Sequence, residues 1–205
     1  KILAHFSESQ KKINTKVIKL IRDNDIIFTH CHSTSVVKSL INAKKQGKKF
    51  EVYNTETRPK YQGRKTAEEL SKAKIKVTMF VDSAFDTAIS GNKDIKKSSK
   101  IFLGSDAILK NCDVVNKVGS RTIAILANRS KIPVYVLADS WKYTKKSQKL
   151  EQRSYNEIWN DNVSKNITIK NPAFEKIPSA MITVIVSDLG VLTPKKFIDK
   201  AKNLF

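Results

Sequence analysis

Short apolar segments rich in β-branched residues alternate along this chain with longer amphipathic segments of helical period. An apolar segment without polar alternation is typical of a parallel strand that helices cover on both faces. The pattern therefore predicts an α/β fold: an open, doubly wound, mostly parallel Rossmann-like sheet with helices on both faces. Six strands are predicted, at Ile26–Thr29, Phe50–Asn54, Val77–Asp82, Ile101–Gly104, Val134–Ala138 and Ile182–Val186.

The amphipathic segments predict a helix after most of these strands and one helix ahead of the first. At the last helix, Thr193 is a good N-cap and Pro194 suits the first helical position. The predicted helices are Leu3–Ile21, Ser35–Lys45, Lys65–Ala73, Ser83–Ser90, Ser120–Arg129 and Pro194–Lys202.

One long polar segment, Lys142–Glu175, lacks a clear strand and interrupts this rhythm. A loop of that length in a compact domain is usually functional or makes an oligomer contact. Its aromatic residues fit a second interpretation equally well, in which they cover the edge of the sheet. These aromatic residues, counted from just before the segment, are Trp141, Tyr143, Tyr155 and Trp159.

The chain has 205 residues and a formal net charge of +20, which raises the question of a nucleic-acid partner. Of its 39 basic residues, 33 are Lys and six are Arg. Proteins that read bases and phosphates favour Arg, often interleaved with aromatic side chains. The lysine clusters lie on predicted helix ends and loops without aromatic neighbours. A solvated, lysine-rich surface is therefore favoured over a nucleic-acid site.

The remaining composition narrows the class of protein further. Two cysteines exclude a disulfide scaffold and a four-cysteine zinc site, and they favour a reducing, cytoplasmic setting. No apolar run approaches the ~18 residues that a membrane span needs, and the first residues do not resemble a signal peptide. Neither GxGxxG nor GxxxxGK[ST] occurs, which argues against dinucleotide and P-loop chemistry. We expect no metal, cofactor or membrane partner.

Small, polar and titratable residues follow the predicted strands, where ligands bind in open α/β sheets. Cys31 falls at a strand-to-helix turn between two histidines, where backbone N–H groups and positive charge predict a lowered thiol pKa. Cys112 is interpreted as a small buried hydrophobe. Asp106 follows a strand and a glycine, and it fits either an acid–base group or the N-cap of a following turn.

Further candidates suggest that the ligand is anionic. Asn116-Lys117-Val118-Gly119-Ser120 is typical of an anion-binding turn that opens a helix. Arg58 and Lys142 are further phosphate partners, or else halves of surface ion pairs. From the residues alone, the chain is predicted to hold a small phosphorylated ligand beside Cys31 and Asp106, with the reaction left open.

Several short motifs, taken in order, resemble one known family along essentially the whole chain. They are Thr29-His30-Cys31-His32-Ser33, Thr55-Glu56-Thr57-Arg58-Pro59 with Gln62-Gly63, Val81-Asp82-Ser83-Ala84, Gly104-Ser105-Asp106-Ala107-Ile108, Val115-Asn116-Lys117-Val118-Gly119, Ala138-Asp139-Ser140-Trp141-Lys142-Tyr143 and Asn171-Pro172-Ala173-Phe174-Glu175. The family joins translation initiation factor 2B alpha/beta/delta-type subunits to isomerases of methylthioribose 1-phosphate and ribose 1,5-bisphosphate. The archaeal-type ribose-1,5-bisphosphate isomerases look most similar.

The resemblance implies an aldose–ketose isomerase with Cys31 as base and Asp106 as acid. It implies that Asn116, Lys117 and Lys142 bind the substrate, together with Arg58, Gln62 and Ser33. The alternative that it leaves open is a non-catalytic initiation-factor-2B-like subunit that binds a nucleotide or sugar phosphate.

The same resemblance implies a homodimer or higher oligomer formed through the α/β domain. It divides the chain into residues 1–22, a remnant or linker helix of an N-terminal helical domain, and a Rossmann-like domain over residues 23–205. The sequence departs from the isomerase pattern at His32, Ser105 and Asn111-Cys112, where Asn, Ala and Asn-Gly are usual.

Overall fold

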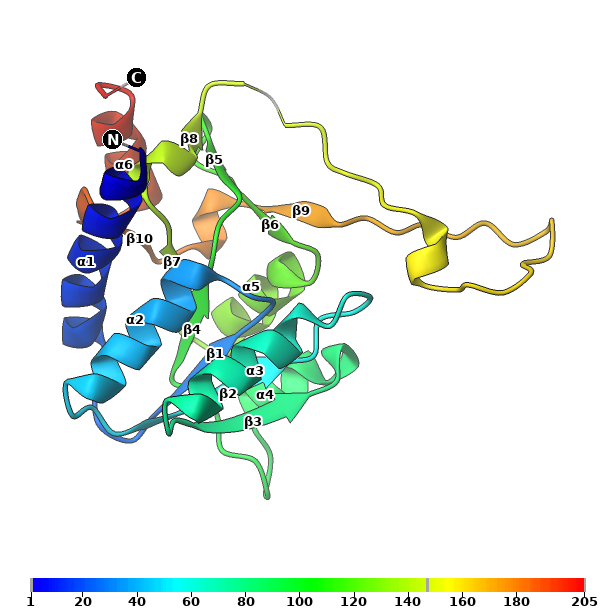
Figure 1. Cartoon of the computed structure of the whole chain (residues 1–205), viewed down its shortest axis with the longest axis horizontal. Helices are drawn as coiled ribbons and strands as arrows, with labels where there is room; N and C mark the ends of the chain where they lie inside the picture. The colour runs from blue at the N-terminus through cyan, green and yellow to red at the C-terminus, as the bar shows by residue number, and fades with distance from the viewer. Residues whose placement is uncertain (1, 147, 205) are drawn as a thin grey trace.

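A seven-stranded, mostly parallel sheet forms the centre of the computed structural model, which describes residues 2–146 and 148–204 (Figure 1). The strand order is β11-β10-β7-β4-β1-β2-β3, and only β11 runs antiparallel to its neighbour. The predicted α/β fold is therefore confirmed. The strands are β1 (Asp25–Thr29), β2 (Phe50–Thr55), β3 (Lys76–Phe80), β4 (Lys100–Leu103), β7 (Val134–Leu137), β10 (Val184–Ser187) and β11 (Gly190–Leu192).

Helices cover both faces of this sheet, and successive residues of the central strands point to opposite faces. Ile27 of β1 packs in one apolar cluster, while its neighbour Phe28 packs in the other. The first face is covered by α1 (Ile2–Leu20), α2 (Thr34–Lys45) and α3 (Gln62–Lys72). The second is covered by α4 (Phe85–Ser90), α5 (Ser120–Arg129) and α6 (Pro194–Ala201).

The ends of the chain confirm two local predictions. Helix α1 precedes the first strand and buries Ile13 and Val17 against the sheet. At α6, the Thr193 hydroxyl accepts a hydrogen bond from the Lys196 N–H, and Pro194 occupies the first turn as expected. No helix in the described part of the chain combines the length and apolarity needed to cross a bilayer.

A second, four-stranded sheet packs beside the first and was not predicted. Its order is β8-β5-β6-β9, formed by β8 (Tyr143–Thr144), β5 (Ala107–Leu109), β6 (Val114–Lys117) and β9 (Phe174–Ile177). These strands have two to four residues each, too few to show a period in the sequence. The partly buried Cys112, in the turn between β5 and β6, packs against the core as a small hydrophobe.

One predicted strand is longer than the observed one. Val77–Asp82 was expected to be strand, but β3 ends at Phe80 and Asp82 begins a 3₁₀ turn, η1 (Asp82–Ala84). β3 is an edge strand whose residues are exposed or half-buried, unlike the fully buried β1. Pairing with a neighbouring strand therefore ends earlier than the apolar run suggests.

The long polar segment forms an arm, here residues 148–173, that reaches beyond the body of the molecule (yellow to orange in Figure 1). Tyr155 and Trp159 on this arm are 51% and 43% exposed. The interpretation in which these two aromatics cover the sheet edge is therefore wrong. Before the arm, Tyr143 packs against the core and Trp141 stacks on His5 with ring centroids 3.8 Å apart. An oligomer contact or another function of the arm stays a prediction.

A buried ion pair joins β1 to β4 at the amino ends of these two central strands. Both carboxylate oxygens of Asp25 lie 2.6 Å from the Lys100 ammonium, and the Ser99 hydroxyl and the Arg22 N–H also donate to this carboxylate. The Lys100 and Asp25 side chains are only 11% and 8% exposed. Because each charge is desolvated, removing one partner leaves the other buried and uncompensated.

We expect Lys100→Met to lower the free energy of unfolding by about 3–5 kcal/mol, measured by urea denaturation. The matched control is Lys76→Met, which removes a 71%-exposed ammonium 3.0 Å from Glu51. An exposed pair of this kind contributes about 0–1 kcal/mol. Equal losses in the two variants would show that the Asp25–Lys100 pair does not depend on burial.

Candidate functional site

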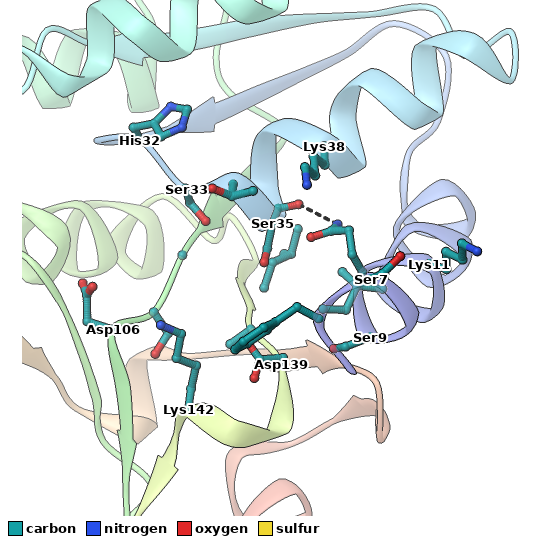
Figure 2. A pocket seen from close by; sticks show the side chains of 18 of the residues that line it. Ser7, Ser9, Lys11, His32, Ser33, Ser35, Lys38, Asp106, Asp139 and Lys142 are labelled. Atoms are coloured by element: carbon teal, nitrogen blue, oxygen red, sulfur yellow. Dashed lines mark hydrogen bonds between the residues drawn. The ribbon is translucent and has the colours of Figure 1, made fainter. Parts of the chain in front are cut away.

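Two cavities open at the carboxyl ends of the parallel strands, where the turns after β1, β2 and β4 meet β6. The smaller, of about 300 Å³, and the larger, of about 670 Å³, share five lining residues. They therefore form one continuous groove. The shared residues are His32, Ser33, Gly104, Asp106 and Asn116. Residues of α1 and α2 line the larger cavity, with Asp106 and Lys142 at its other side (Figure 2).

The groove brings together seven of the eight residues predicted to form the site. Six of them line the smaller cavity: Cys31, Asp106, Asn116, Lys117, Gln62 and Ser33. Lys142 lines the larger cavity beside Asp106. Arg58 lines neither cavity: its exposed guanidinium lies 4.8 Å from the Tyr61 ring centroid instead.

His30 forms the floor of the smaller cavity and joins three segments of the chain. Its Nε2 lies 2.9 Å from the Val118 carbonyl oxygen, and its Nδ1 lies 2.6 Å from the Thr55 hydroxyl. A carbonyl oxygen only accepts, so Nε2 carries the proton and Nδ1 accepts from Thr55. Burial lowers the pKa of His30, which keeps the ring neutral and holds this arrangement.

The backbone around Cys31 is held in a left-handed conformation, with φ of 66°. The Cys31 N–H donates to the Thr57 hydroxyl at 2.9 Å, and the Thr66 hydroxyl donates to the Cys31 carbonyl at 2.8 Å. Thr57 is fixed in turn because its N–H donates to Asp82 at 2.9 Å. The strained turn at Cys31 is therefore held by side chains from the β2–α3 loop and α3.

The prediction of a lowered Cys31 pKa is wrong. Burial raises the pKa of this thiol and outweighs the lowering caused by the His32 N–H and by Lys117. The expected help from flanking imidazolium groups is missing, because burial also lowers the pKa of both His30 and His32. In the ligand-free protein, Cys31 is therefore a neutral thiol at pH 7.

Asp106 follows β4 and points into the groove without capping a helix, because the next residues form β5. Its carboxylate makes no hydrogen bond or ion pair within the described residues. The side chain reaches solvent, but the surrounding protein raises the Asp106 pKa by desolvation, against the pull of Lys142 and Lys117. A carboxyl group with a raised pKa and no partner is suited to proton transfer.

Gly104 allows the β4 turn to lie against the first turn of α2. A Cβ at this position would lie 2.6 Å from the Ser33 hydroxyl oxygen, closer than real Cβ atoms come. Ser33 is the N-cap of α2 and accepts a hydrogen bond from the Val36 N–H. The glycine therefore sets how closely Ser33 approaches Asp106.

The predicted anion-binding turn is found between β6 and α5. Gly119 at the N-cap has φ of 102°, and the Ser120 hydroxyl accepts from the Asn116 amide while donating to the Lys117 carbonyl. Lys117 is only 4% exposed, and its ammonium has no hydrogen-bond or ion-pair partner among residues 2–146 and 148–204. An unpaired, buried cation in a cavity is a strong position for an anionic ligand.

Sequence reasoning missed Lys65, Arg153, Ala173 and Phe174, which also line the smaller cavity. Arg153 lies on the arm. Ala173 is the last residue of the arm, and Phe174 is the first residue of β9. The one local signal was the i,i+4 spacing of Arg153 and Glu157, typical of an ion pair. Nothing in that spacing indicates that Arg153 lines a cavity together with residues as distant in the sequence as Cys31.

No group of three or more His, Cys, Asp or Glu side chains in the described structure could hold a metal ion. The lining residues offer instead ammonium groups, amides and hydroxyls, which suit a phosphorylated, hydroxyl-rich ligand. The smaller cavity therefore places a thiol and a carboxyl group beside groups that can bind an anion.

Comparison with known proteins gives the family. The sequence model of the Initiation factor 2 subunit family matches residues 1–194. This chain belongs to that family. It is 34% identical over 196 residues to the ribose 1,5-bisphosphate isomerase of Thermococcus kodakarensis, covering 91% of this chain and 59% of that protein.

The family also contains proteins with other names. The chain is 34% identical over 214 residues to the translation initiation factor eIF2B subunit alpha of Dictyostelium discoideum, covering 97% of this chain and 64% of that protein. Among solved structures, the translation initiation factor eIF-2B of Pyrococcus horikoshii matches with a TM-score of 0.83 at 30% identity, covering 96% of this chain and 68% of that one. The chain spans about three fifths of the length of these two sequence relatives.

The buried neutral His30 predicts loss of stability in acid. Its pKa is depressed on folding, so its contribution is complete above the unfolded value near 6.5 and is lost as pH falls below it. His32, whose pKa is also lowered, adds a contribution of the same sign. We expect the free energy of unfolding to fall between pH 7 and 5 by up to about 1.4 kcal/mol per pH unit for His30, with a smaller contribution from the partly exposed His32.

Denaturant unfolding at several pH values measures this slope. His30→Gln should reduce the slope and lower stability at pH 7, because the hydrogen bonds to Thr55 and Val118 are disturbed. His32→Gln should remove its own smaller share. An unchanged slope in His30→Gln would contradict the assignment of a neutral, buried ring.

Proposed function

We propose that this groove is the active site of an aldose–ketose isomerase that converts ribose 1,5-bisphosphate to ribulose 1,5-bisphosphate. The observation that carries the proposal is that Cys31 and Asp106 line one small cavity together with the unpaired, buried Lys117. Relatives named ribose 1,5-bisphosphate isomerase, such as those of Thermococcus kodakarensis and Pyrococcus furiosus, each 34% identical, support it. The reaction needs acid–base groups, and we assign it no metal or cofactor.

In the productive form, the one proton that Cys31 and Asp106 hold between them lies on Asp106, so Cys31 is a thiolate and removes the proton from C2 of the sugar. The electron pair of that C–H bond forms a C1–C2 double bond while the C1–ring oxygen bond breaks. Asp106 protonates the leaving ring oxygen. Asp106, now a carboxylate, takes the proton of the 2-hydroxyl as the C2 carbonyl forms, and Cys31 returns its proton to C1, which restores both groups. Every atom of the aldose is retained in the ketose.

The remaining lining residues hold the substrate. Lys117 and Lys142 bind phosphate oxygens, and Asn116 and Ser33 bind hydroxyl or phosphate oxygens. Gln62 supplies a further position: its side-chain oxygen is buried without a hydrogen-bond partner in the described structure. A sugar hydroxyl donating to this oxygen would remove the cost of that unsatisfied acceptor.

A second candidate function is a non-catalytic subunit that binds a sugar phosphate or nucleotide. It is favoured by the match to a translation initiation factor eIF2B subunit alpha over 97% of this chain. Binding of ribose 1,5-bisphosphate without turnover would favour this candidate over the isomerase.

We expect Cys31→Ser and Asp106→Asn each to lower kcat by a factor of roughly 10² to 10⁴, because each removes one partner in proton transfer. The assay follows ribulose 1,5-bisphosphate formed from ribose 1,5-bisphosphate. Cys112→Ser is the matched control, since Cys112 is a free thiol that lines neither cavity. Its kcat should equal that of the wild type, and absence of turnover in the wild type would exclude the isomerase.

The pH profile of kcat/KM tests the site in the free protein. In the productive form of the site, Cys31 and Asp106 together hold one proton, so one group is protonated and the other is not. Both pKa values are raised, the thiol from 9.0 and the carboxyl from 3.8. We therefore expect a level kcat/KM through neutral pH, with an acid limb above pH 3.8 and an alkaline limb above pH 9.0. A limb between pH 6 and 8 that disappears in Cys31→Ser would contradict the raised thiol pKa.

A further inference from the structure

Arg153 is the one guanidinium among the described residues that line the smaller cavity, which it shares with Cys31 and Lys117. It comes from the arm, the segment that the sequence left without a role. Its side chain is 34% exposed, so it lies at the rim between the cavity and solvent.

Glu157 holds the Arg153 guanidinium in one orientation. Nε and Nη2 of Arg153 both donate to this carboxylate, with Nη2 2.7 Å from Oε1 and Nε 2.9 Å from Oε2. The Glu157 carboxylate also lies 3.2 Å from the Lys60 ammonium and 3.3 Å from the Asn171 amide nitrogen. A planar guanidinium fixed along one edge leaves only its remaining nitrogen for other partners.

The charge of Glu157 persists over the pH range of any practical assay. Its side chain is 12% exposed, and the Arg153 hydrogen bonds, with help from Lys60, lower the Glu157 pKa to about 2. The ion pair between Glu157 and Arg153 is therefore fully formed above the usual carboxyl pKa of 4.5 and is lost only as pH falls toward 2.

The base of the arm is joined firmly to the turn that carries Lys117. The Arg153 N–H donates to the Asn171 carbonyl at 2.9 Å, and the Ala173 N–H donates to the Glu151 carbonyl at 2.9 Å. The Val118 N–H then donates to the Ala173 carbonyl at 3.0 Å. This ladder fixes Arg153 relative to Lys117 across the cavity.

The third guanidinium nitrogen, Nη1, remains available. Nη1 makes an ion pair with Oε1 of Glu151 at 3.7 Å, beyond hydrogen-bond distance, and the Glu151 side chain is 52% exposed. Nη1 has no hydrogen-bond acceptor within the described part of the chain. A guanidinium N–H without an acceptor can donate a charge-assisted hydrogen bond to an anionic oxygen of a ligand in the cavity.

We propose that Arg153 is a further ligand-binding residue, held by Glu157, whose Nη1 donates to a phosphate oxygen of the ligand in the smaller cavity. The inference rests on the proposed function only for the identity of the sugar. Arg153 on the arm and Lys117 at the end of β6 both bind the phosphate. Glu157 does not touch the phosphate and acts as a positioning residue that orients Arg153.

The test uses ribose 5-phosphate and inorganic phosphate as probes, titrated calorimetrically into the protein, so that it does not depend on turnover. We expect Arg153→Gln to weaken ribose 5-phosphate binding by roughly ten- to a hundredfold, the value of a charge-assisted hydrogen bond. Arg153→Lys should recover only part of the affinity, because it keeps the charge and loses the fork. Arg129→Gln on the exposed side of α5 is the matched control and should bind as the wild type does.

Two isosteric variants separate positioning from simple charge. Glu151→Gln and Glu157→Gln each remove one negative charge beside the same guanidinium. Simple electrostatics predicts that both tighten anion binding. Our proposal predicts opposite signs: Glu151→Gln tightens binding, and Glu157→Gln weakens it because the guanidinium loses its anchor.

Equal affinities in Arg153→Gln and Arg129→Gln, tighter binding in Glu157→Gln, or no binding of either probe to the wild type would overturn the proposal. Thermal unfolding of each variant checks that the fold is retained. Probe binding that depends on Arg153 supports the inference whether or not ribulose 1,5-bisphosphate is formed, so the failure of the isomerase assay remains distinguishable.

Discussion

The geometry of the groove depends on one neutral imidazole. His30 stands directly after the central strand β1 and bonds Thr55 at the end of β2 and Val118 in the turn before α5. Thr55 precedes the loop whose Thr57 hydrogen-bonds Cys31, and Val118 directly follows the buried Lys117. A protonated ring would donate from both nitrogens, so the Thr55 hydroxyl would have to change from donor to acceptor. Burial of His30 therefore helps to set the geometry of the groove.

The sequence was sufficient for six of the seven strands of the large sheet, because its central strands are buried on both faces and read as continuous apolar runs. It missed β11, a partly exposed edge strand of three residues. It failed for β5, β6, β8 and β9, since strands this short leave no period and one of them includes the polar pair Asn116 and Lys117. It also extended β3 too far, because an apolar residue at a sheet edge does not guarantee a pairing partner. Local sequence pattern thus predicts the strands of the buried core and misses short strands and strand ends that depend on tertiary contacts.

The site was predictable to the extent that parallel strands place their carboxyl ends at one edge. That rule located Cys31, Asp106 and the Asn116-Lys117 turn in one groove. It gave no way to sense desolvation, so it predicted a lowered thiol pKa where burial raises it. It also gave no way to place the arm, whose Arg153 reaches the cavity through a ladder of backbone bonds with residues 171–173. The net charge of +20 proved less informative than Lys117, a buried lysine whose ammonium has no hydrogen-bond or ion-pair partner among the described residues.

The division of the groove has an evolutionary consequence. Cys31 lines the smaller cavity only, whereas Ser33 and Asn116 line both cavities and Lys142 belongs to the larger one. In the proposed isomerase, proton transfer is confined to Cys31 and Asp106, while ligand binding is distributed over many side chains. Under that proposal, a single exchange at position 31 would remove most of the turnover and leave the ligand-binding residues in place. A fold built in this way can pass between catalyst and regulator without rebuilding its binding surface.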